Sequence, residues 1–224
     1  GDGTAAVRST PAQIPGLTGV TQIAAGGSNG SGYALLSSGQ IRAWGFNGNG
    51  QLGDGTTTTR PTPVTVLAPG GAGPLTGIVE VTGGNAHALA RTSTGQVYAW
   101  GFNSFGQVGD GTTTNRSLPV LVAGLSGITS ITAGFDASFA VQVTGEALVW
   151  GRTATTYATD QLSPVVLLGP GGTGALTGVQ RIASGFITSY ALLTSGEVRA
   201  WGDGSLGQLG NNSTANSSYP VTVQ

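Results

Sequence analysis

The sequence predicts an all-β protein of the β-propeller class, complete or partial, built from blades of four short antiparallel strands. Three observations lead to this prediction. Glycine accounts for 41 of the 224 residues and charged residues for only 8%, a composition that favours turns and short strands over helices. Trp-Gly pairs recur at positions 44, 100, 150 and 201. The segments around these pairs repeat every 50–56 residues, which is typical of propeller blades.

Each Trp-Gly pair ends the second strand of a predicted hairpin. The four hairpins read YALLSSGQIRAWG, LARTSTGQVYAWG, FAVQVTGEALVWG and YALLTSGEVRAWG, with one glycine at a shared turn position. Such a turn favours glycine because glycine adopts a positive φ without steric cost. The structural repeat residues are Trp44, Trp100, Trp150 and Trp201 in the pairs and Gly39, Gly95, Gly145 and Gly196 in the turns.

Two more strands are predicted before each hairpin. Segments such as LTGVTQIAAGG alternate apolar and polar residues, the pattern of a half-buried strand. Short segments led by proline form the other strand, because proline suits a strand start or a sheet edge. They are TPAQI at residues 10–14, then TPVTV, LPVLV and SPVVL. Arg91 stands where the other repeats have Leu or Val, so we expect it to pair with Glu80, since an inward charge needs a partner.

We expect one domain over residues 1–224. The approximate repeats are 1–45, 46–101, 102–151 and 152–202, with a fragment of a fifth at 203–224. The chain opens on GDGT, a motif that elsewhere in the sequence follows a Trp-Gly pair. We therefore interpret the first residues as the end of a Trp-Gly loop that belongs to a repeat not present in this sequence. Without an initiator Met, the chain is read as a processed or excised segment.

No enzyme, cofactor or metal site is expected. Gly48, Gly50 and Gly53 have the spacing of a dinucleotide-binding loop, but Ser104 replaces the first of them in the next repeat and no helical pattern follows. A zinc site needs several His, Cys or acidic ligands, and the chain has one His and no Cys. Each GDGT loop offers a single acid, which indicates a turn rather than a calcium site.

Composition also limits the partners. The net charge is −1 and the eight basic residues are dispersed arginines, so no nucleic acid is expected. No apolar run is long enough for membrane insertion. Low charge with abundant Thr, Ser, Asn and Gly indicates an extracellular or cell-surface bacterial protein. Candidate glycan acceptors in N-x-S/T or Thr runs are Asn29, Asn115, Asn211, Asn212, Asn216 and Thr56 to Thr59.

The repeats resemble those of the regulator-of-chromosome-condensation family of seven-bladed propellers, in a bacterial secreted or surface version. GGNAHALA with His87, WGFNGNGQLGDGT and WGFNSFGQVGDGT carry the resemblance, whereas the third repeat departs from it with WGRTATTYATDQLSP. The family implies a protein-binding platform and a structural place for His87 inside the blade. Seven blades need about 350 residues at this repeat length. The chain is therefore part of a larger ring, one of several chains that assemble into a ring, or a ring that closes with fewer than seven blades.

Two functions remain open. The first is a non-catalytic extracellular protein-interaction or structural module, with self-assembly as a surface or filament component as one version. The alternative is a soluble propeller that acts as an inhibitor or ligand binder through its loop face. Loops carry binding residues and aromatic side chains anchor interfaces. The candidate partner-binding residues are Phe46, Phe102, Phe105, Phe135, Tyr157, Phe186, Arg60, Arg116 and Arg152.

Overall fold

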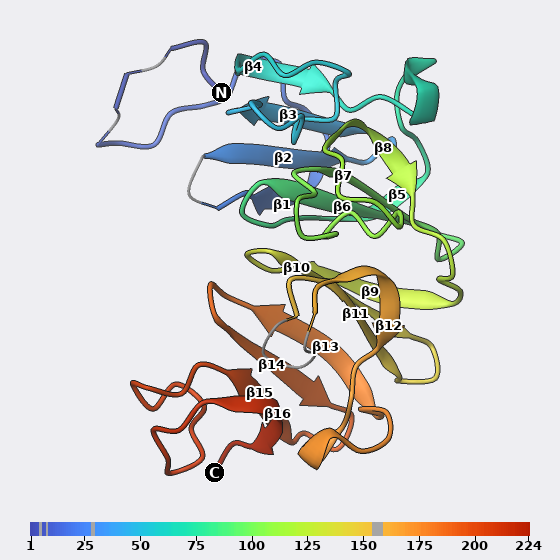
Figure 1. The fold of residues 1–224 in the computed structure, drawn as a ribbon. Coiled ribbons are helices and arrows are strands. Elements are labelled where there is room, and N and C mark those ends of the chain that lie inside the picture. The colour runs from blue at the N-terminus through green and yellow to red at the C-terminus, as the bar shows by residue number, and fades with distance from the viewer. Residues whose placement is uncertain (5, 8, 28–29, 154–158) are drawn as a thin grey trace.

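The computed structural model describes residues 1–224 except 5, 8, 28–29 and 154–158. The described residues form four antiparallel four-stranded sheets (Figure 1). The first two sheets contain β1 (Val20–Ala25), β2 (Ser31–Leu36), β3 (Ile41–Gly45) and β4 (Arg60–Thr65), then β5 (Ile78–Gly83), β6 (His87–Thr92), β7 (Val97–Gly101) and β8 (Arg116–Leu121). The other two contain β9 (Ile128–Ala133), β10 (Ala137–Gln142), β11 (Ala147–Gly151) and β12 (Gln161–Val166), then β13 (Val179–Ser184), β14 (Thr188–Leu193), β15 (Val198–Gly202) and β16 (Ser217–Thr222). The all-β fold of four-stranded antiparallel blades is confirmed.

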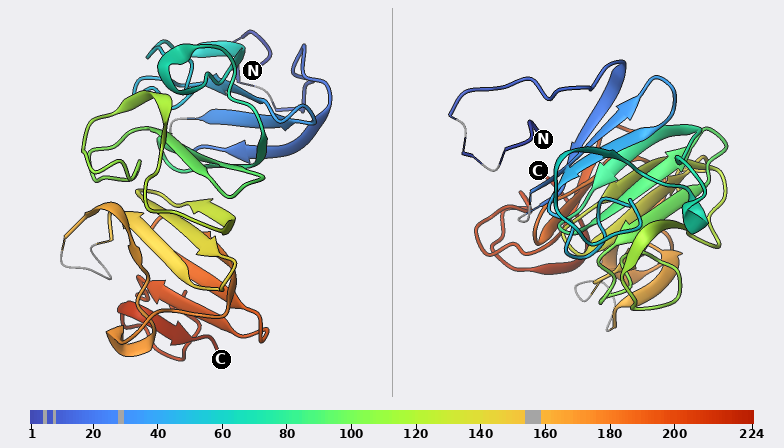
Figure 2. Two further views of the ribbon diagram at one scale, coloured as in Figure 1. Left: turned by 90° about the vertical axis from the view of Figure 1, so that its right-hand side faces the viewer. Right: turned by 90° about the horizontal axis from the view of Figure 1, so that it is seen from above.

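The four sheets follow one another in chain order from the N-terminal to the C-terminal end (Figures 1 and 2). The first strands β1, β5, β9 and β13 contact each other in succession, so they form the inner side of the array. Short 3-10 turns, η1 (Pro69–Gly71) and η2 (Pro170–Gly172), lie in the two longer connections between sheets. No helix among the described residues is long and apolar enough to span a membrane.

The proline-led strands lie differently from the sequence expectation. Each pairs with the strand that ends in Trp-Gly, as β4 does with β3, and so becomes the last strand of the preceding sheet. Residues 203–224 accordingly supply the last loop and β16 of the fourth sheet. The strand predicted at residues 10–14 is wrong, because those residues adopt no regular structure. Among the described residues no Trp-Gly strand precedes it, so it has no partner for a sheet.

The first residues behave as the end of a Trp-Gly loop, as the GDGT motif predicts. The Gly3 N–H donates to Pro61 O at 2.9 Å. Equivalent bonds run from Gly55 N to Ser117 O at 3.0 Å and from Gly111 N to Leu162 O at 2.9 Å. In each case the second glycine of GDGT bonds the outer strand of the following sheet. The motif therefore ties neighbouring sheets together.

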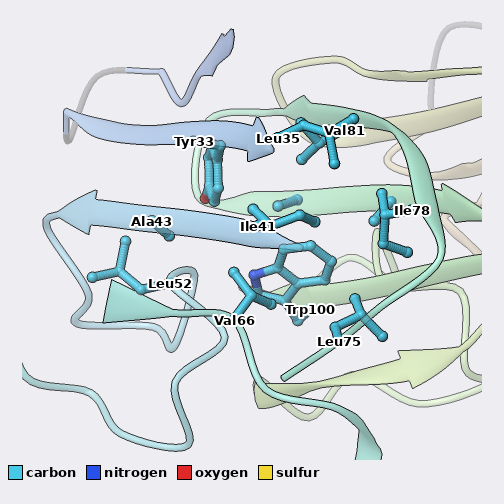
Figure 3. Packing of buried hydrophobic residues seen from close by; sticks show 12 residues of the cluster. Tyr33, Leu35, Ile41, Ala43, Leu52, Val66, Leu75, Ile78, Val81 and Trp100 are labelled. Atoms are coloured by element: carbon cyan, nitrogen blue, oxygen red, sulfur yellow. The ribbon is translucent and has the colours of Figure 1, made fainter. Parts of the chain in front are cut away.

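The core consists of three apolar layers, one at each junction between neighbouring sheets. In the first junction, Trp100 of the second sheet packs edge-on against Tyr33 of the first, with ring centroids 6.4 Å apart (Figure 3). Both side chains are fully buried. The small residues Ala88 and Ala90 lie beside Trp100, which lets the sheets approach closely. Burial of these layers is the main stabilising contribution that the fold offers.

A charged pair also bridges sheets. Arg91 Nε lies 2.8 Å from Glu80 Oε2, which confirms the predicted pairing. The other carboxylate oxygen of Glu80 accepts a hydrogen bond from Ile131 N in the third sheet at 3.4 Å. Arg91 in turn donates to Ile128 O at 3.4 Å. The guanidinium of Arg91, which breaks the apolar pattern, therefore has a partner in its own sheet and another in the next sheet.

Candidate protein-binding face

Two sets of loops lie at one end of the sheets, because strands in an antiparallel sheet alternate in direction. They are the Trp-Gly loops, between the third and fourth strands, and the turns between the first and second strands. We call this end the loop face. The turns at Gly39, Gly95, Gly145 and Gly196 lie at the opposite end, and their φ angles are between 75° and 87°. Most of the aromatic and arginine residues singled out in the sequence lie on the loop face.

Each of the first two Trp-Gly loops is closed by its own polar side chains. Asn47 Oδ1 accepts from Leu52 N at 2.9 Å, and Asn47 Nδ2 donates to Asp54 Oδ1 at 3.1 Å. Asp54 also accepts from Thr56 Oγ1 at 2.7 Å and from Arg60 Nε at 2.8 Å. Burial raises the pKa of Asp54, but the hydrogen bonds from Thr56 and Arg60 outweigh it and hold that pKa below its usual value.

The second loop repeats this arrangement with Asn103, Asp110 and Arg116, where Arg116 Nε lies 2.6 Å from Asp110 Oδ2. Arg60 and Arg116, two of the predicted partner-binding residues, therefore each form an ion pair that holds a loop. Their side chains remain 34% exposed, so contact with a partner stays a prediction. The part of the chain that the structure describes contains no cluster of three or more His, Cys, Asp or Glu residues suited to a metal ion.

His87 lies fully buried in the second sheet. Ser138 Oγ donates to Gln107 O at 2.7 Å, so its single proton is used and His87 Nε2 is the donor to Ser138 Oγ at 2.9 Å. Burial lowers the pKa of His87 to about 4, so the ring is neutral at neutral pH. The histidine links the second sheet to the third, away from solvent.

Five of the predicted partner-binding residues lie on the loop face in loops of the second, third and fourth sheets. Phe102 and Phe105 pack edge-on at 5.8 Å, and the Arg152 guanidinium carbon lies 3.6 Å from the centre of the Phe105 ring. Phe135 and Phe186 form a second edge-on pair at 4.3 Å. We call these five residues the aromatic–arginine cluster. Phe46 lies apart from them in the first Trp-Gly loop, and Tyr157 lies outside the described residues.

Asp136, which follows Phe135 in the chain, pairs with Arg152, although it was not among the predicted partner-binding residues. Its Oδ2 lies 3.6 Å from Arg152 Nη1, and its Oδ1 accepts from Gln107 Nε2 at 3.5 Å. Burial raises the pKa of Asp136 above its usual value, while Arg152 acts in the opposite direction and Asp160 adds to the rise. The carboxyl group is therefore a partly buried partner of the half-exposed Arg152.

A cavity of about 220 Å³ opens beside this cluster, between the third and fourth sheets. Phe139, Val149 and Trp201 supply apolar walls, and Phe135, Phe186, Asp136 and Arg152 are also among the lining residues. Phe186 is 66% exposed, so apolar surface continues from the cavity to solvent. The arrangement suits binding of an apolar group, with a cation and an acceptor beside it.

Comparison with known families identifies the repeat. Residues 38–91, 94–141 and 195–224 match the family model described as the regulator of chromosome condensation (RCC1) repeat. A second model of the same description matches residues 78–107 and 179–208. The matches fall on all four sheets.

Two curated relatives illustrate the extent of the similarity. Human E3 ubiquitin-protein ligase HERC2 is 32% identical over 213 residues, which cover 92% of this chain and 4% of the ligase. The ultraviolet-B receptor UVR8 of Arabidopsis thaliana is 29% identical over 235 aligned residues, which cover 100% of this chain and 51% of the receptor. The chain thus spans about half of the receptor and far less of the ligase. Both relatives are eukaryotic, and a bacterial origin stays a prediction.

Solved structures show the same fold. Prp20p from Saccharomyces cerevisiae superposes with a TM-score of 0.80 at 22% identity, covering 97% of this chain and 54% of Prp20p. Human WBSCR16 superposes with a TM-score of 0.76 at 21% identity, covering 95% of this chain and 55% of the other. The yeast RCC1 (Prp20) structure bound to Kap60 gives a TM-score of 0.79 at 21% identity, with 97% and 52% covered. The four sheets therefore correspond to blades of a propeller.

Proposed function

Because the chain belongs to the regulator of chromosome condensation (RCC1) repeat family, we propose that it is a non-catalytic protein-interaction module that works outside the cell or at its surface. Solved relatives support the interaction role: yeast RCC1 (Prp20) is bound to Kap60 in one structure, and the Prp20p structure was described with its binding to Gsp1p and histones. Composition supports the extracellular location, since charge is low and Thr, Ser, Asn and Gly abound. Loop variation on a rigid scaffold is a common basis for binding.

The aromatic–arginine cluster carries the proposal. It presents two aromatic pairs and a guanidinium on the loop face, next to a cavity with apolar and polar walls. Aromatic residues and arginine are the types that most often dominate binding energy at protein interfaces. The cluster is already assembled in the unbound chain, because Arg152 pairs with Asp136 and lies over the Phe105 ring. A preformed anchor of this kind loses little conformational entropy on binding.

Truncation of the cluster tests this role. The double variant Phe105→Ala/Phe186→Ala is expected to reduce capture of partner from the culture medium and cell-surface fraction of the producing organism by about 10-fold or more. Capture is measured by cross-linking to the purified chain and quantitative mass spectrometry. Val143→Ala is the control, because Val143 is equally apolar and 76% exposed but lies at the other end of the sheets. Unchanged capture by the double variant contradicts a role for the cluster. If a cytoplasmic fraction, tested in parallel, is the only source of captured partner, the proposed location is contradicted.

Self-association is a second candidate, favoured by the outer face of the first sheet. Val20 and Ile23 on this face are 40% and 76% exposed, whereas their counterparts in the second sheet, Ile78 and Val81, are 3% and 1% exposed. The counterparts are buried because they pack on the preceding sheet. The first sheet thus offers the surface that every later sheet uses to join its predecessor.

The fourth sheet offers the complementary surface. Gln208 O accepts from Tyr190 OH at 2.7 Å, as Gln51 O accepts from Tyr33 OH at 2.8 Å. Gln51 O also accepts the Trp100 N–H of the next sheet, and among the described residues Gln208 O has no such second donor. We propose that the first sheet of a second copy packs here, head to tail.

Light scattering of the native chain tests this assembly. The expected mass is a multiple of 22.1 kDa, and Ile23→Asp is expected to return the particle to a single chain, because a charge buried at an interface is costly. Val143→Asp adds the same charge to an exposed position away from both outer faces and leaves the mass unchanged. A single-chain mass for the wild type at all concentrations rules this candidate out.

A further inference from the structure

The junctions between sheets differ in one bond. In the first junction, the Trp100 indole N–H donates to Gln51 O at 2.8 Å. In the second, the Trp150 indole N–H donates to Gln107 O at 2.9 Å. Both acceptors are main-chain oxygens of a Gly-Gln-Leu/Val-Gly segment in the preceding Trp-Gly loop. That segment also places Leu52 or Val108, both fully buried, in the junction.

The third junction lacks this segment. The Trp-Gly loops at 46–59, 102–115 and 203–216 each have fourteen residues between strands, whereas the loop at 152–160 has nine and no Gly-Gln-Leu-Gly sequence. Trp201 occupies the same place as Trp100 and Trp150 and is 3% exposed. No hydrogen bond from its indole nitrogen to any described residue is present. Trp201 lines the cavity of about 220 Å³, whereas the buried Leu52 and Val108 pack in the same clusters as Trp100 and Trp150.

The N–H of a largely buried tryptophan usually has a hydrogen-bond acceptor, so a group that brings an acceptor into the cavity would complete this junction. Phe139 and Val149 give the cavity apolar walls beside the polar Asp136, Arg152 and Ser189, and Phe139 packs edge-on against Trp201 at 6.1 Å. A cavity of this size is smaller than the roughly 300–1,000 Å³ of typical small-molecule sites. It fits one side chain with its flanking backbone rather than a whole cofactor. The filled junctions show which chemistry satisfies the tryptophan, namely a main-chain carbonyl next to a Leu or Val side chain.

We propose that this cavity is a binding pocket for an apolar side chain of a partner polypeptide, whose main-chain carbonyl accepts the hydrogen bond of the Trp201 indole. The incoming segment takes the place that Gly-Gln-Leu/Val-Gly occupies in the first two junctions. Phe135, Phe186 and Arg152 line the entrance and contact the residues that flank the inserted side chain. This inference rests on the protein-interaction role proposed above and specifies the kind of segment that the partner inserts.

The chain's own loop sequence provides the probe. The peptide N-acetyl-Gly-Gln-Leu-Gly-amide is titrated to about 10 mM into the ¹⁵N-labelled protein, a range suited to a weak ligand. The four tryptophan indole N–H signals are followed by NMR, with Trp201 assigned from a Trp201→Phe variant. Before peptide is added, the Trp201 indole is expected to exchange with solvent faster than those of Trp100 and Trp150. On titration, the Trp201 signal is expected to shift with saturation, while the same peptide with Asp in place of Leu gives no shift.

A matched pair of variants separates binding from stability. Trp201→Phe removes an unbonded N–H and is expected to weaken the peptide about 5-fold, the effect of one hydrogen bond, as measured from shifts of the Phe139 and Val149 amides. Trp150→Phe removes a bonded N–H in a filled junction, so it lowers the thermal midpoint and leaves peptide affinity unchanged.

Three results overturn the proposal. They are slow exchange of the Trp201 indole, no saturable shift at 10 mM peptide, and equal binding by Leu and Asp peptides. Failure of the pocket is distinguishable from failure of the interaction role. If the partner still binds Trp201→Phe as it binds the wild type, the module binds elsewhere on its loop face.

Discussion

Replacing Gly101 by alanine is expected to destabilise the protein by about 3 kcal/mol or more, the combined effect of backbone strain and overpacking. Gly101 follows Trp100 and has a φ of +103°, a conformation that other residues rarely adopt. A Cβ added here would lie 2.5 Å from Ala86 O and 2.8 Å from His87 Cα. Both are backbone atoms at the start of the neighbouring strand β6, so neither can move aside cheaply.

The measurement is urea unfolding followed by tryptophan fluorescence. Gly73→Ala is the matched control, because Gly73 has a φ of +108° and no atom within 4 Å of its added Cβ. It isolates backbone strain, which costs about 1–3 kcal/mol. If both variants lose the same stability, close approach of the strands is not the reason for glycine at this position.

Trp100→Ala is expected to lower the free energy of unfolding by about 3–5 kcal/mol, the usual range for truncating a buried Trp. The side chain is fully buried against Tyr33, and its N–H is bonded to Gln51 O. The loss is a large fraction of the roughly 5–15 kcal/mol that stabilises a typical domain. Removing the ring leaves a cavity between two sheets that neither can easily close.

Trp44→Ala provides the comparison. Trp44 occupies the same repeat position, but it lies on the outer face of the first sheet and is only half-buried. Its loss is expected to cost about 1 kcal/mol, the middle of the range for ordinary substitutions, when measured by chemical denaturation at concentrations where the chain is monomeric. Equal losses at the two positions would show that repeat position, rather than burial between sheets, determines the contribution of the tryptophan.

Local strand pattern was predictable from the sequence, whereas strand pairing was less so. Trp-Gly pairs, turn glycines and alternating segments depend only on residues that are close together in the sequence. The strands and turns that they predict are present in the structure. A proline-led strand has the same local sequence pattern whichever sheet it joins. Residues 10–14 have this pattern and were therefore predicted as a strand, but the described part of the structure provides no neighbouring strand for them to pair with. The Arg91–Glu80 pair was predictable because the two residues belong to adjacent strands of one repeat unit.

The binding face was predictable only in outline. Phe102, Phe105, Phe135 and Phe186 are aromatic residues in loops, which is a signal that sequence carries. Arg60 and Arg116 follow Asp54 and Asp110 by six residues, and that spacing was the available sign of ion pairs within the loops. The role proposed for Trp201 rests on a contrast with Trp100 and Trp150, whose indoles each bond a main-chain oxygen of the preceding loop, and side-chain patterns do not report on a main-chain acceptor.

The same main-chain acceptor has a consequence for how such repeats diversify. A backbone oxygen is present at every residue, so substitution within the Trp-Gly loop does not by itself remove the bond to the next tryptophan. Deletion of the segment that carries the acceptor does remove the bond. In this architecture a cavity with a ready hydrogen-bond donor can therefore arise by losing a few residues, in one evolutionary event and without any new side chain.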